Sequence, residues 1–281
     1  MIDLHAHSIF SDGTDTPEAL AQAADLAGLR ALALTDHDTL AGLERFLAHQ
    51  PRVATLLVPG IELSCRFMGR PLHMLGLFLD PADPKLRDRV GRMRAQRLER
   101  NQQMLELLRA KGIPITWDEV AAEAPTDLVS RTHFARVLVR SGAAGSHQDA
   151  FHRLIGDDAP CFVPFPELAP REAVGWIREA GGAAVVAHPG RGFPRGFRWD
   201  AAMLELKGAG IHGFEAYYPD YGPVEHRYFL DLARDLDLVP SGGSDYHGRN
   251  KPGIQLGVGG GGLEVPDAVL ERLLKARTDS L

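Results

Sequence analysis

The sequence has few cysteines, few lysines and no long hydrophobic run. Cys65 and Cys161 are the only cysteines, which excludes a disulfide framework and leads us to expect a cytoplasmic location. Charged residues interrupt the apolar stretches before any reaches the roughly 18 residues that a membrane span needs, so we expect no membrane association. Residues 1–5 show neither the basic nor the apolar region of a secretory signal.

The charge balance also narrows the range of functions. A net charge of -6 argues against unselective binding of nucleic acid. Of the 31 basic residues, 26 are arginine, whose planar guanidinium suits bidentate binding of phosphate, although a GC-rich genome would also explain the excess. With 281 residues, 44% of them hydrophobic and 24% charged, the chain has the composition of one large globular domain or of one domain with an insertion.

Segments typical of strands and helices alternate near both ends of the chain. Apolar runs predict strands over residues 4–7, 30–35, 54–64, 71–79, 183–187, 211–217 and 238–241. Helices are predicted between them, over residues 17–28, from Asp38 or Thr39 to about His49, and over 171–180, 223–236 and 266–276. This alternation predicts an α/β protein with a parallel sheet. About seven strands indicate a β/α barrel, whose site lies at the C-terminal ends of the strands.

A run of predicted helices without strands interrupts the alternation. It begins with a helix from Pro84 to Gly112 and continues with a capping box at residues 116–119 and with helices capped by Ser130 and Ser146. We therefore interpret residues 84–160 as a helical subdomain inserted into a single barrel domain that spans residues 1–281. We expect this insertion to form a lid over the active site.

Histidine and acidic residues gather where the predicted strands end. His5 and His7 are two residues apart on one strand, so both imidazoles can reach one metal ion. At least five predicted strand ends carry such residues, which independent placement on the surface would not favour. The candidate metal ligands are His5, His7, Asp12, His37, Glu62, His73, His188, Asp245 and His247. Imidazole and carboxylate suit Mn, Fe or Zn, and nine candidates are enough for two or three divalent ions, with Glu62 as the bridge.

Taken one at a time, several of these residues have a simpler structural interpretation. His5 and His7 are compatible with two surface histidines, Asp12 with a turn residue and His73 with a core residue. The number of candidates at strand ends favours metal binding.

Polar residues of the predicted insertion form a second set of candidates. In the helix over 84–112, Arg97, Arg100 and Asn101 either cover the core with their aliphatic stems or contact a phosphate or base. Ser130 begins a predicted helix, whose first N–H groups attract anions, although an ordinary cap explains it equally. The predicted substrate-binding residues are Arg97, Arg100, Asn101, Ser130, Arg131 and His133. His133 is also the candidate catalytic residue that protonates the leaving alcohol, with a water held by the metals as the alternative.

The combined motifs resemble the PHP (polymerase and histidinol phosphatase) family of phosphoesterases. The resemblance rests on His5-Ala6-His7, Ser11-Asp12-Gly13, Thr35-Asp36-His37-Asp38, Glu62, His73, Ala187-His188-Pro189 and Gly243-Ser244-Asp245-Tyr246-His247. It implies a distorted seven-stranded β/α barrel with a trinuclear metal site, often of manganese. It further implies one ion held by His5, His7, Glu62 and Asp245, a second by Glu62, His73 and His188, and a third by Asp12, His37 and His247.

Within that family, the chain is most similar to the stand-alone branch that removes the 3′-phosphate from 3′,5′-nucleotide bisphosphates such as pAp. Some members of that branch act as 5′-to-3′ exoribonucleases on short RNA. The resemblance therefore implies a metal-dependent phosphoric ester hydrolase, a small nucleotide or short oligonucleotide as substrate, and no stable protein partner. Histidinol-phosphate phosphatase, a carbon-nitrogen hydrolase on a related barrel and a catalytically silent PHP scaffold are the alternatives. The arginine-rich insertion argues against the first and the complete ligand set against the last.

Overall fold

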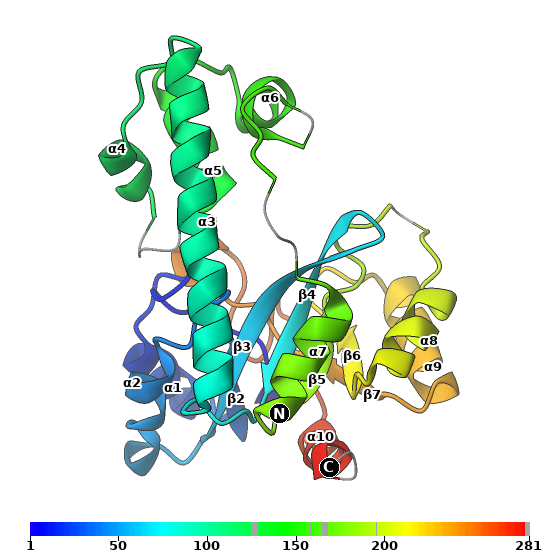
Figure 1. Ribbon diagram of the computed structural model, residues 1–281. Coiled ribbons are helices and arrows are strands. Elements are labelled where there is room, and N and C mark those ends of the chain that lie inside the picture. The colour runs from blue at the N-terminus through cyan, green and yellow to red at the C-terminus, as the bar shows by residue number, and fades with distance from the viewer. Residues whose placement is uncertain (125–128, 158, 165–167, 195, 279–281) are drawn as a thin grey trace. The chain divides into compact units, whose positions relative to one another are not determined.

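The computed structural model describes residues 1–124, 129–157, 159–164, 168–194 and 196–278 (Figure 1). The chain divides into two compact units, which are treated separately below. Unit 1 comprises Met1–Arg89 and Glu167–Leu281, and unit 2 comprises Val90–Pro166. The strands belong to unit 1, whereas unit 2 is helical among its described residues.

One seven-stranded sheet forms the centre of unit 1. Its strands follow the order of the sequence: β1 (Ile2–Asp3), β2 (Ala31–Leu34), β3 (Leu56–Phe67), β4 (Arg70–Leu77), β5 (Ala183–Ala187), β6 (Gly213–Tyr217) and β7 (Val239–Gly242). Both faces are covered, as the uninterrupted burial of β2 and β5 shows. The strand predicted over residues 4–7 is displaced, because β1 ends at Asp3 and only Ala6 of the predicted range forms an isolated bridge, with Tyr246. The other predicted strands lie close to their expected positions.

The prediction of a parallel sheet is wrong at β4, which pairs antiparallel with both β3 and β5. Only Met68 and Gly69 separate β3 from β4, and both have positive φ angles, 51° and 72°. Two such residues form a tight hairpin turn, whereas a parallel connection needs a crossover of a dozen or more residues. The hairpin therefore reverses the direction of β4 within an otherwise parallel sheet.

Backbone hydrogen bonds connect the two ends of the sheet. The Leu4 N–H donates to the Gly242 carbonyl at 3.3 Å, and the Asp245 N–H donates to the His5 carbonyl at 2.9 Å. The His7 N–H also donates to the Tyr246 carbonyl, at 2.9 Å. The segments that follow β1 and β7 therefore lie side by side and nearly close the sheet into a barrel. The predicted distorted seven-stranded barrel is confirmed.

Helices cover the sheet of unit 1. They are α1 (Pro17–Leu26), α2 (Leu43–Leu47), α7 (Pro170–Glu179), α8 (Asp200–Ala209), α9 (Pro223–Asp235) and α10 (Ala268–Thr278), with short 3-10 turns at Gln50–Arg52 and Gly248–Asn250. Thr16 caps α1 as predicted, because its hydroxyl accepts the Ala19 N–H at 3.2 Å. The sequence analysis did not predict α8.

The sequence suggested that Asp38 could cap the second helix, but the structure shows a different role for this residue. Its carboxylate instead accepts hydrogen bonds from the Ser64 N–H and hydroxyl, each at 2.8 Å. These bonds tie the loop after β2 to β3, so α2 begins only at Leu43. The contact lies between residues 26 positions apart and leaves no local pattern in the sequence.

Unit 2 has a helical core of its own. It contains the C-terminal part of α3 (Pro84–Ala110), together with α4 (Trp117–Ala121), α5 (Arg131–Arg140), α6 (His147–Ala150) and a π turn at Phe151–Ile155. The predicted capping box is present, with the Thr116 N–H bonded to the Glu119 carboxylate at 2.7 Å. Its buried core includes Met104, Leu108, Phe134, Leu138 and Ile155. The predicted lid over the active site stays a prediction, and residues 125–128 and 158 of the predicted insertion lie outside the described residues.

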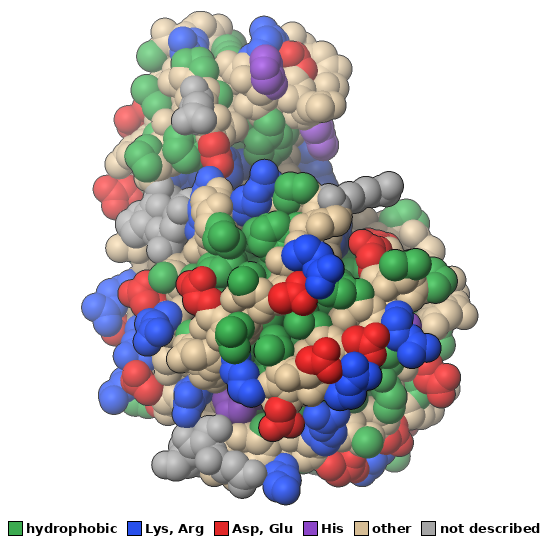
Figure 2. Space-filling model, turned by 90° about the vertical axis from the view of Figure 1, so that its right-hand side faces the viewer, with side chains coloured by type: hydrophobic (Ala, Val, Ile, Leu, Met, Phe, Trp, Pro, Cys, Tyr) green, Lys and Arg blue, Asp and Glu red, His purple; other side chains and the backbone are tan. Residues whose placement is uncertain are grey.

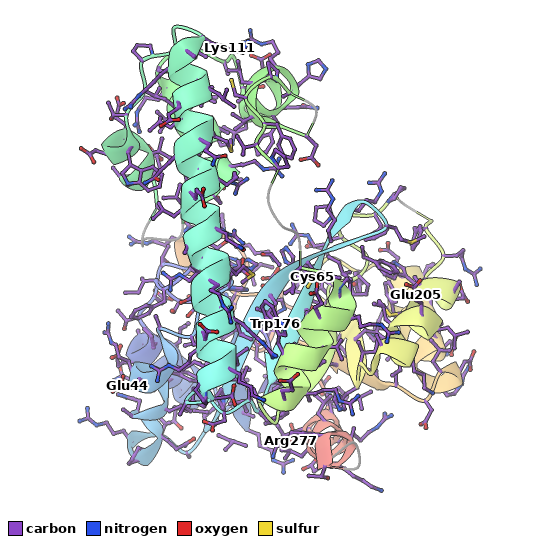
Figure 3. All side chains as sticks on the ribbon, viewed as in Figure 1. Glu44, Cys65, Lys111, Trp176, Glu205 and Arg277 are labelled. Atoms are coloured by element: carbon purple, nitrogen blue, oxygen red, sulfur yellow. The ribbon has the colours of Figure 1, made fainter. Side chains whose placement is uncertain are left out.

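The remaining expectations from composition concern cysteine, membrane and surface charge. Cys65, labelled in Figure 3, and Cys161 are both free and buried. Among the described helices, none is long and apolar enough to span a membrane. On the face shown in Figure 2, acidic and basic side chains are interspersed, which does not favour unselective attraction of a polyanion there.

Candidate metal centre

The nine predicted ligands lie together in unit 1. His5, His7, His37, His188, Asp245 and His247 follow strands β1, β2, β5 and β7, and Asp12 lies in the loop before α1. Four groups have ligand atoms within 4.8 Å of one another: His7, Asp12, His37 and His247; His5, His7 and Asp245; His5, Glu62 and His188; and His37, Glu62 and His73. Every predicted ligand therefore belongs to at least one group.

The direction of β4 explains how His73, which lies inside this strand, joins ligands that follow other strands. His73 is near the start of β4, whose antiparallel direction places it beside Ala187 at the end of β5. The next residue, His188, is another candidate ligand. Both imidazoles therefore reach the same end of the barrel, although the strands that carry them run in opposite directions.

Glu62 is fully buried, and its two carboxylate oxygens face different histidines. Oε1 lies 2.7 Å from His73 Nδ1 and 3.0 Å from His188 Nε2. Oε2 lies 3.1 Å from the Nε2 atoms of both His5 and His7. A carboxylate that bridges two ions presents its oxygens in this way, one toward each set of ligands.

Asp12 organises a second part of the cluster. One carboxylate oxygen lies 3.2 Å from His247 Nε2 and the other lies 3.8 Å from His37 Nε2. Asp12 Oδ1 and His37 Nδ1 are buried, yet neither forms a hydrogen bond within the described part of the chain. Ligand atoms without such partners fit a position where a cation would satisfy them.

The protonation of the cluster reflects burial and mutual attraction. Burial lowers the pKa of His7, but hydrogen bonds with Asp245 and Glu62 outweigh this effect and raise it to about 10. Burial raises the pKa of the Glu62 carboxyl, but His37, His5 and His73 outweigh it and hold the pKa well below its usual value. Protons therefore balance the carboxylates here, and divalent cations would replace them. The donor set of imidazoles and carboxylates fits the metal ions that the sequence predicts.

Glu215 supports two of the candidate ligands, and the sequence analysis did not include it among the site residues. Its carboxylate is fully buried, with Oε1 3.0 Å from His5 Nδ1 and Oε2 accepting the His188 N–H at 2.6 Å. A carboxylate at Nδ1 fixes the tautomer of His5 and leaves Nε2 for a metal. The signal that marked Glu62, an acidic residue within an apolar strand, also marks Glu215 near the end of β6.

Three further residues missed by the sequence analysis surround Asp245. Its Oδ2 accepts hydrogen bonds from the Tyr218 hydroxyl at 2.7 Å and the Lys251 ammonium at 2.8 Å, and the Arg191 guanidinium is 3.4 Å away. Its Oδ1 faces His7 Nε2 at 3.3 Å. These donors therefore orient the carboxylate so that one oxygen points into the histidine cluster.

A cavity of about 350 Å³ opens onto this cluster. Most of the candidate ligands line it, together with Arg191, whose side chain is half exposed. A guanidinium at the wall of a metal cluster can bind a phosphoryl oxygen. Arg191, Tyr218 and Lys251 come from loops after β5, β6 and β7, which explains why no motif identifies them.

We predict that Glu215→Gln weakens metal binding about tenfold, at the lower end of the range for residues that support metal ligands. The amide keeps an acceptor oxygen but loses the charge that favours one His5 tautomer. The measurement is chelator competition for the bound ion, with Glu205→Gln on the exposed surface of α8 (Figure 3) as the control. Equal affinities in both variants would show that Glu215 does not act through the ligands.

The structure brings three of the predicted substrate-binding arginines together within unit 2. Burial, together with the charges of Arg97 and Arg131, lowers the pKa of the Arg100 guanidinium to about 10. Arg131 donates to the Asp157 carboxylate at 2.7 Å and lies over the rings of Phe151 and Phe162. Like charges held this close favour an anion between them.

The other predicted substrate-binding residues have structural contacts. Asn101 is buried and donates to the Val129 carbonyl at 2.8 Å. His133 is buried, and its Nδ1 accepts the Ser130 N–H at 3.0 Å, so the two residues close the first turn of α5. Their roles in substrate binding, and that of His133 in catalysis, stay predictions.

Comparison with known proteins gives the family. A family model described as PHP domain matches residues 3–116. The 3′,5′-nucleoside bisphosphate phosphatase of Chromobacterium violaceum is 36% identical over 257 residues, which cover 91% of this chain and 90% of the relative. The chain therefore belongs to the PHP family. As a member of that family it is a metal-dependent phosphoesterase, and the prediction of an enzyme is confirmed.

Further members of the PHP family extend the similarity. A 5′-3′ exoribonuclease of Salmonella typhimurium is 34% identical over 91% of this chain and 87% of its own length. A solved structure described as a metal-dependent phosphoesterase from Bifidobacterium adolescentis has a TM-score of 0.80 and 31% identity, covering 98% of this chain and 96% of that chain. An amidohydrolase structure from Chromobacterium violaceum with bound sulfate has a TM-score of 0.79 and 35% identity, with the same coverage.

Proposed function

We propose that this PHP protein removes the 3′-phosphate from 3′,5′-nucleotide bisphosphates such as pAp. The observation that carries the proposal is the ligand cluster of unit 1, in a chain that is 36% identical over 91% of its length to a 3′,5′-nucleoside bisphosphate phosphatase. The ligand cluster of unit 1 suits the reacting phosphate, and the arginines at positions 97, 100 and 131 of unit 2 suit a second one. The second phosphate of a bisphosphate gives these arginines a role, whereas histidinol phosphate has only the reacting phosphate.

We further propose two or three transition ions in the cluster, with Mn as the expected metal and Fe or Zn as alternatives. Glu62 would bridge two ions, His73 and His188 would complete one of them, and Asp12 with His37 and His247 would hold a third. Bound ions of this kind neutralise phosphoryl oxygens and lower the pKa of water, so that a nucleophile forms near neutral pH. Arg191 would bind a phosphoryl oxygen from the cavity wall.

Metal content gives a direct test of this assignment. We expect two to three transition ions per chain in protein prepared without chelator, because nine ligands exceed the needs of one ion. Elemental analysis of the purified protein, before and after reconstitution with Mn, provides the measurement. A content below one ion per chain after reconstitution would contradict the assignment.

Phosphate release tests the proposed substrate. The Mn-loaded protein is compared on pAp, on nucleotide 3′- and 5′-monophosphates, and on histidinol phosphate at equal concentrations. We expect the highest kcat/KM on pAp, because the chain is similar to a 3′,5′-nucleoside bisphosphate phosphatase over most of its length. A higher kcat/KM on histidinol phosphate would favour that alternative and overturn the proposal.

A second activity, 5′-to-3′ hydrolysis of short RNA, is favoured by the similarity to exoribonucleases. A 5′-phosphorylated oligonucleotide also presents two phosphates, one of them in a diester. We infer that residues 84–160 act as a lid that carries the arginines to the substrate, and that His133 is the candidate proton donor to the leaving alcohol. Product analysis on 5′-phosphorylated and 5′-hydroxyl RNA distinguishes this activity, because only the former offers the terminal phosphate.

A further inference from the structure

A second cavity in unit 1 has no part in the proposed chemistry. Its volume is about 450 Å³, a size typical of small-molecule sites, and its lining includes Tyr217, Tyr218, Tyr221, His226 and Glu264. The tyrosines come from the end of β6 and the loop after it, the histidine from α9, and Glu264 from the segment before α10. We call it the aromatic cavity.

Packing fixes the rings of the aromatic cavity. Tyr217 and His226 have ring centroids 5.1 Å apart at an interplanar angle of 63°, and those of Tyr218 and Tyr221 are 5.3 Å apart at 51°. Tyr221 in turn stacks on Phe229 at 4.9 Å. Rings held by their neighbours lose little conformational entropy when a planar ligand stacks on them.

The polar groups of the cavity indicate what kind of ligand fits. His226 Nε2 is buried and, within the described part of the chain, forms no hydrogen bond, so a ligand would satisfy it. Glu264 is the only acidic residue among the described lining residues, and neither Lys nor Arg lines the cavity there. A carboxylate without a cation disfavours phosphate and favours an uncharged ring with N–H donors.

The aromatic cavity and the metal cavity share a wall. Tyr218 lines the aromatic cavity, and its hydroxyl donates to Asp245 at 2.7 Å. The Tyr221 hydroxyl accepts the Gly190 N–H at 3.0 Å, two residues after His188. The two cavities are therefore neighbours, with Tyr218 and its hydrogen bond to Asp245 between them.

We propose that the aromatic cavity binds a nucleobase that carries an exocyclic amino group. The ring stacks on the tyrosines, and the amino group donates to the Glu264 carboxylate. Guanine presents two adjacent donors, its N1–H and its amino group, to a carboxylate. Adenine and cytosine present one amino group each, whereas uracil has no amino group and only its ring N3–H. The statement that this base belongs to the substrate rests on the proposed function. The affinity of the cavity for a free base is independent of that function.

Binding of free nucleosides to the full-length protein tests the cavity directly. By calorimetry or ligand-observed NMR, we expect guanosine to bind most tightly, then adenosine and cytidine, with uridine weakest. Tyr217→Ala should lower the affinity for guanosine about tenfold through the loss of one stacking ring, whereas Tyr217→Phe should bind guanosine as tightly as wild type. Leu204→Ala, on the exposed surface of α8, is the control for a substitution outside the cavity.

Glu264→Gln provides a sharper test, because the amide adds a donor that can serve a uracil carbonyl. The preference for guanosine over uridine should fall about tenfold, the discrimination expected from one well-placed polar pair. Three results would overturn the proposal. The first is equal affinity for all four nucleosides, and the second is no binding of any nucleoside. The third is unchanged nucleoside affinity in both Tyr217→Ala and Glu264→Gln.

Kinetics on pAp and on ribose 3,5-bisphosphate, which has no base, separates this proposal from the proposed function. Tyr217→Ala should raise KM for pAp about tenfold and leave KM for the base-free substrate unchanged. Nucleoside binding without bisphosphate hydrolysis would refute the proposed function and leave the cavity assignment intact. Hydrolysis of pAp with the same KM in wild type and Tyr217→Ala would show that the base of the substrate does not use the cavity.

Discussion

Glu62→Gln is expected to lose at least one bound ion and to lower kcat by about 10³-fold, at the upper end of the range for removing one group that stabilises developing charge. The carboxylate oxygens of Glu62 lie on two sides of the cluster, 2.7 Å from His73 and 3.1 Å from His5 and His7. The amide removes the charge and one ligand oxygen, so two ions would share a single neutral donor.

Metal content and turnover must be measured on the same preparation of Glu62→Gln. Glu205→Gln, on α8, controls for the substitution itself and should match wild type. Glu62→Asp keeps the charge on a shorter side chain, so its metal content and kcat should lie between those of Glu62→Gln and wild type. Circular dichroism establishes that the Gln variant is folded. A folded variant with full metal content and near-wild-type turnover would show that Glu62 does not bridge.

Arg100→Ala and Arg131→Ala are expected to impair hydrolysis of pAp more than that of a 3′-monophosphate. An arginine that binds only the remote phosphate contributes binding energy that orients the reacting phosphate. Loss of one charge-assisted pair costs about 1.5–3 kcal/mol, or roughly ten- to a hundredfold in kcat/KM. Burial and the charges of Arg97 and Arg131 together lower the pKa of Arg100 to about 10, so the three guanidinium groups interact electrostatically.

Asp157→Asn is the matched control, because Arg131 donates to Asp157 at 2.7 Å. If Arg131 serves only to hold unit 2 together, removing either partner of this ion pair should reduce activity similarly. If Arg131 binds phosphate, Asp157→Asn should leave kcat/KM for pAp at or above the wild-type value. Equal losses of Arg100→Ala on both substrates would place that residue at the reacting phosphate, or would indicate a folding defect.

Local patterns predicted most of the fold. Thr16 and Pro17 begin α1, and the Thr116 capping box begins α4, because both signals depend on residues within one helical turn. The direction of β4 was not predicted, because strand periodicity carries no information on direction. The start of α2 was not predicted for a similar reason. The carboxylate of Asp38 accepts a hydrogen bond from the distant Ser64 and does not cap the helix.

The sequence by itself identified the PHP family and the nine candidate metal ligands that the structure brings together. Most of these candidates carry a local mark, an ionisable residue at the end of an apolar run, and parallel strands bring such ends to one edge of a barrel. The tertiary structure alone decided which residues support those ligands. Glu215 reaches His5 across 210 positions, and Lys251 and Tyr218 meet at Asp245 from separate loops. The geometry of the loops determines these contacts. The periodicity of the sequence does not predict them, because the partners become neighbours only when the barrel closes.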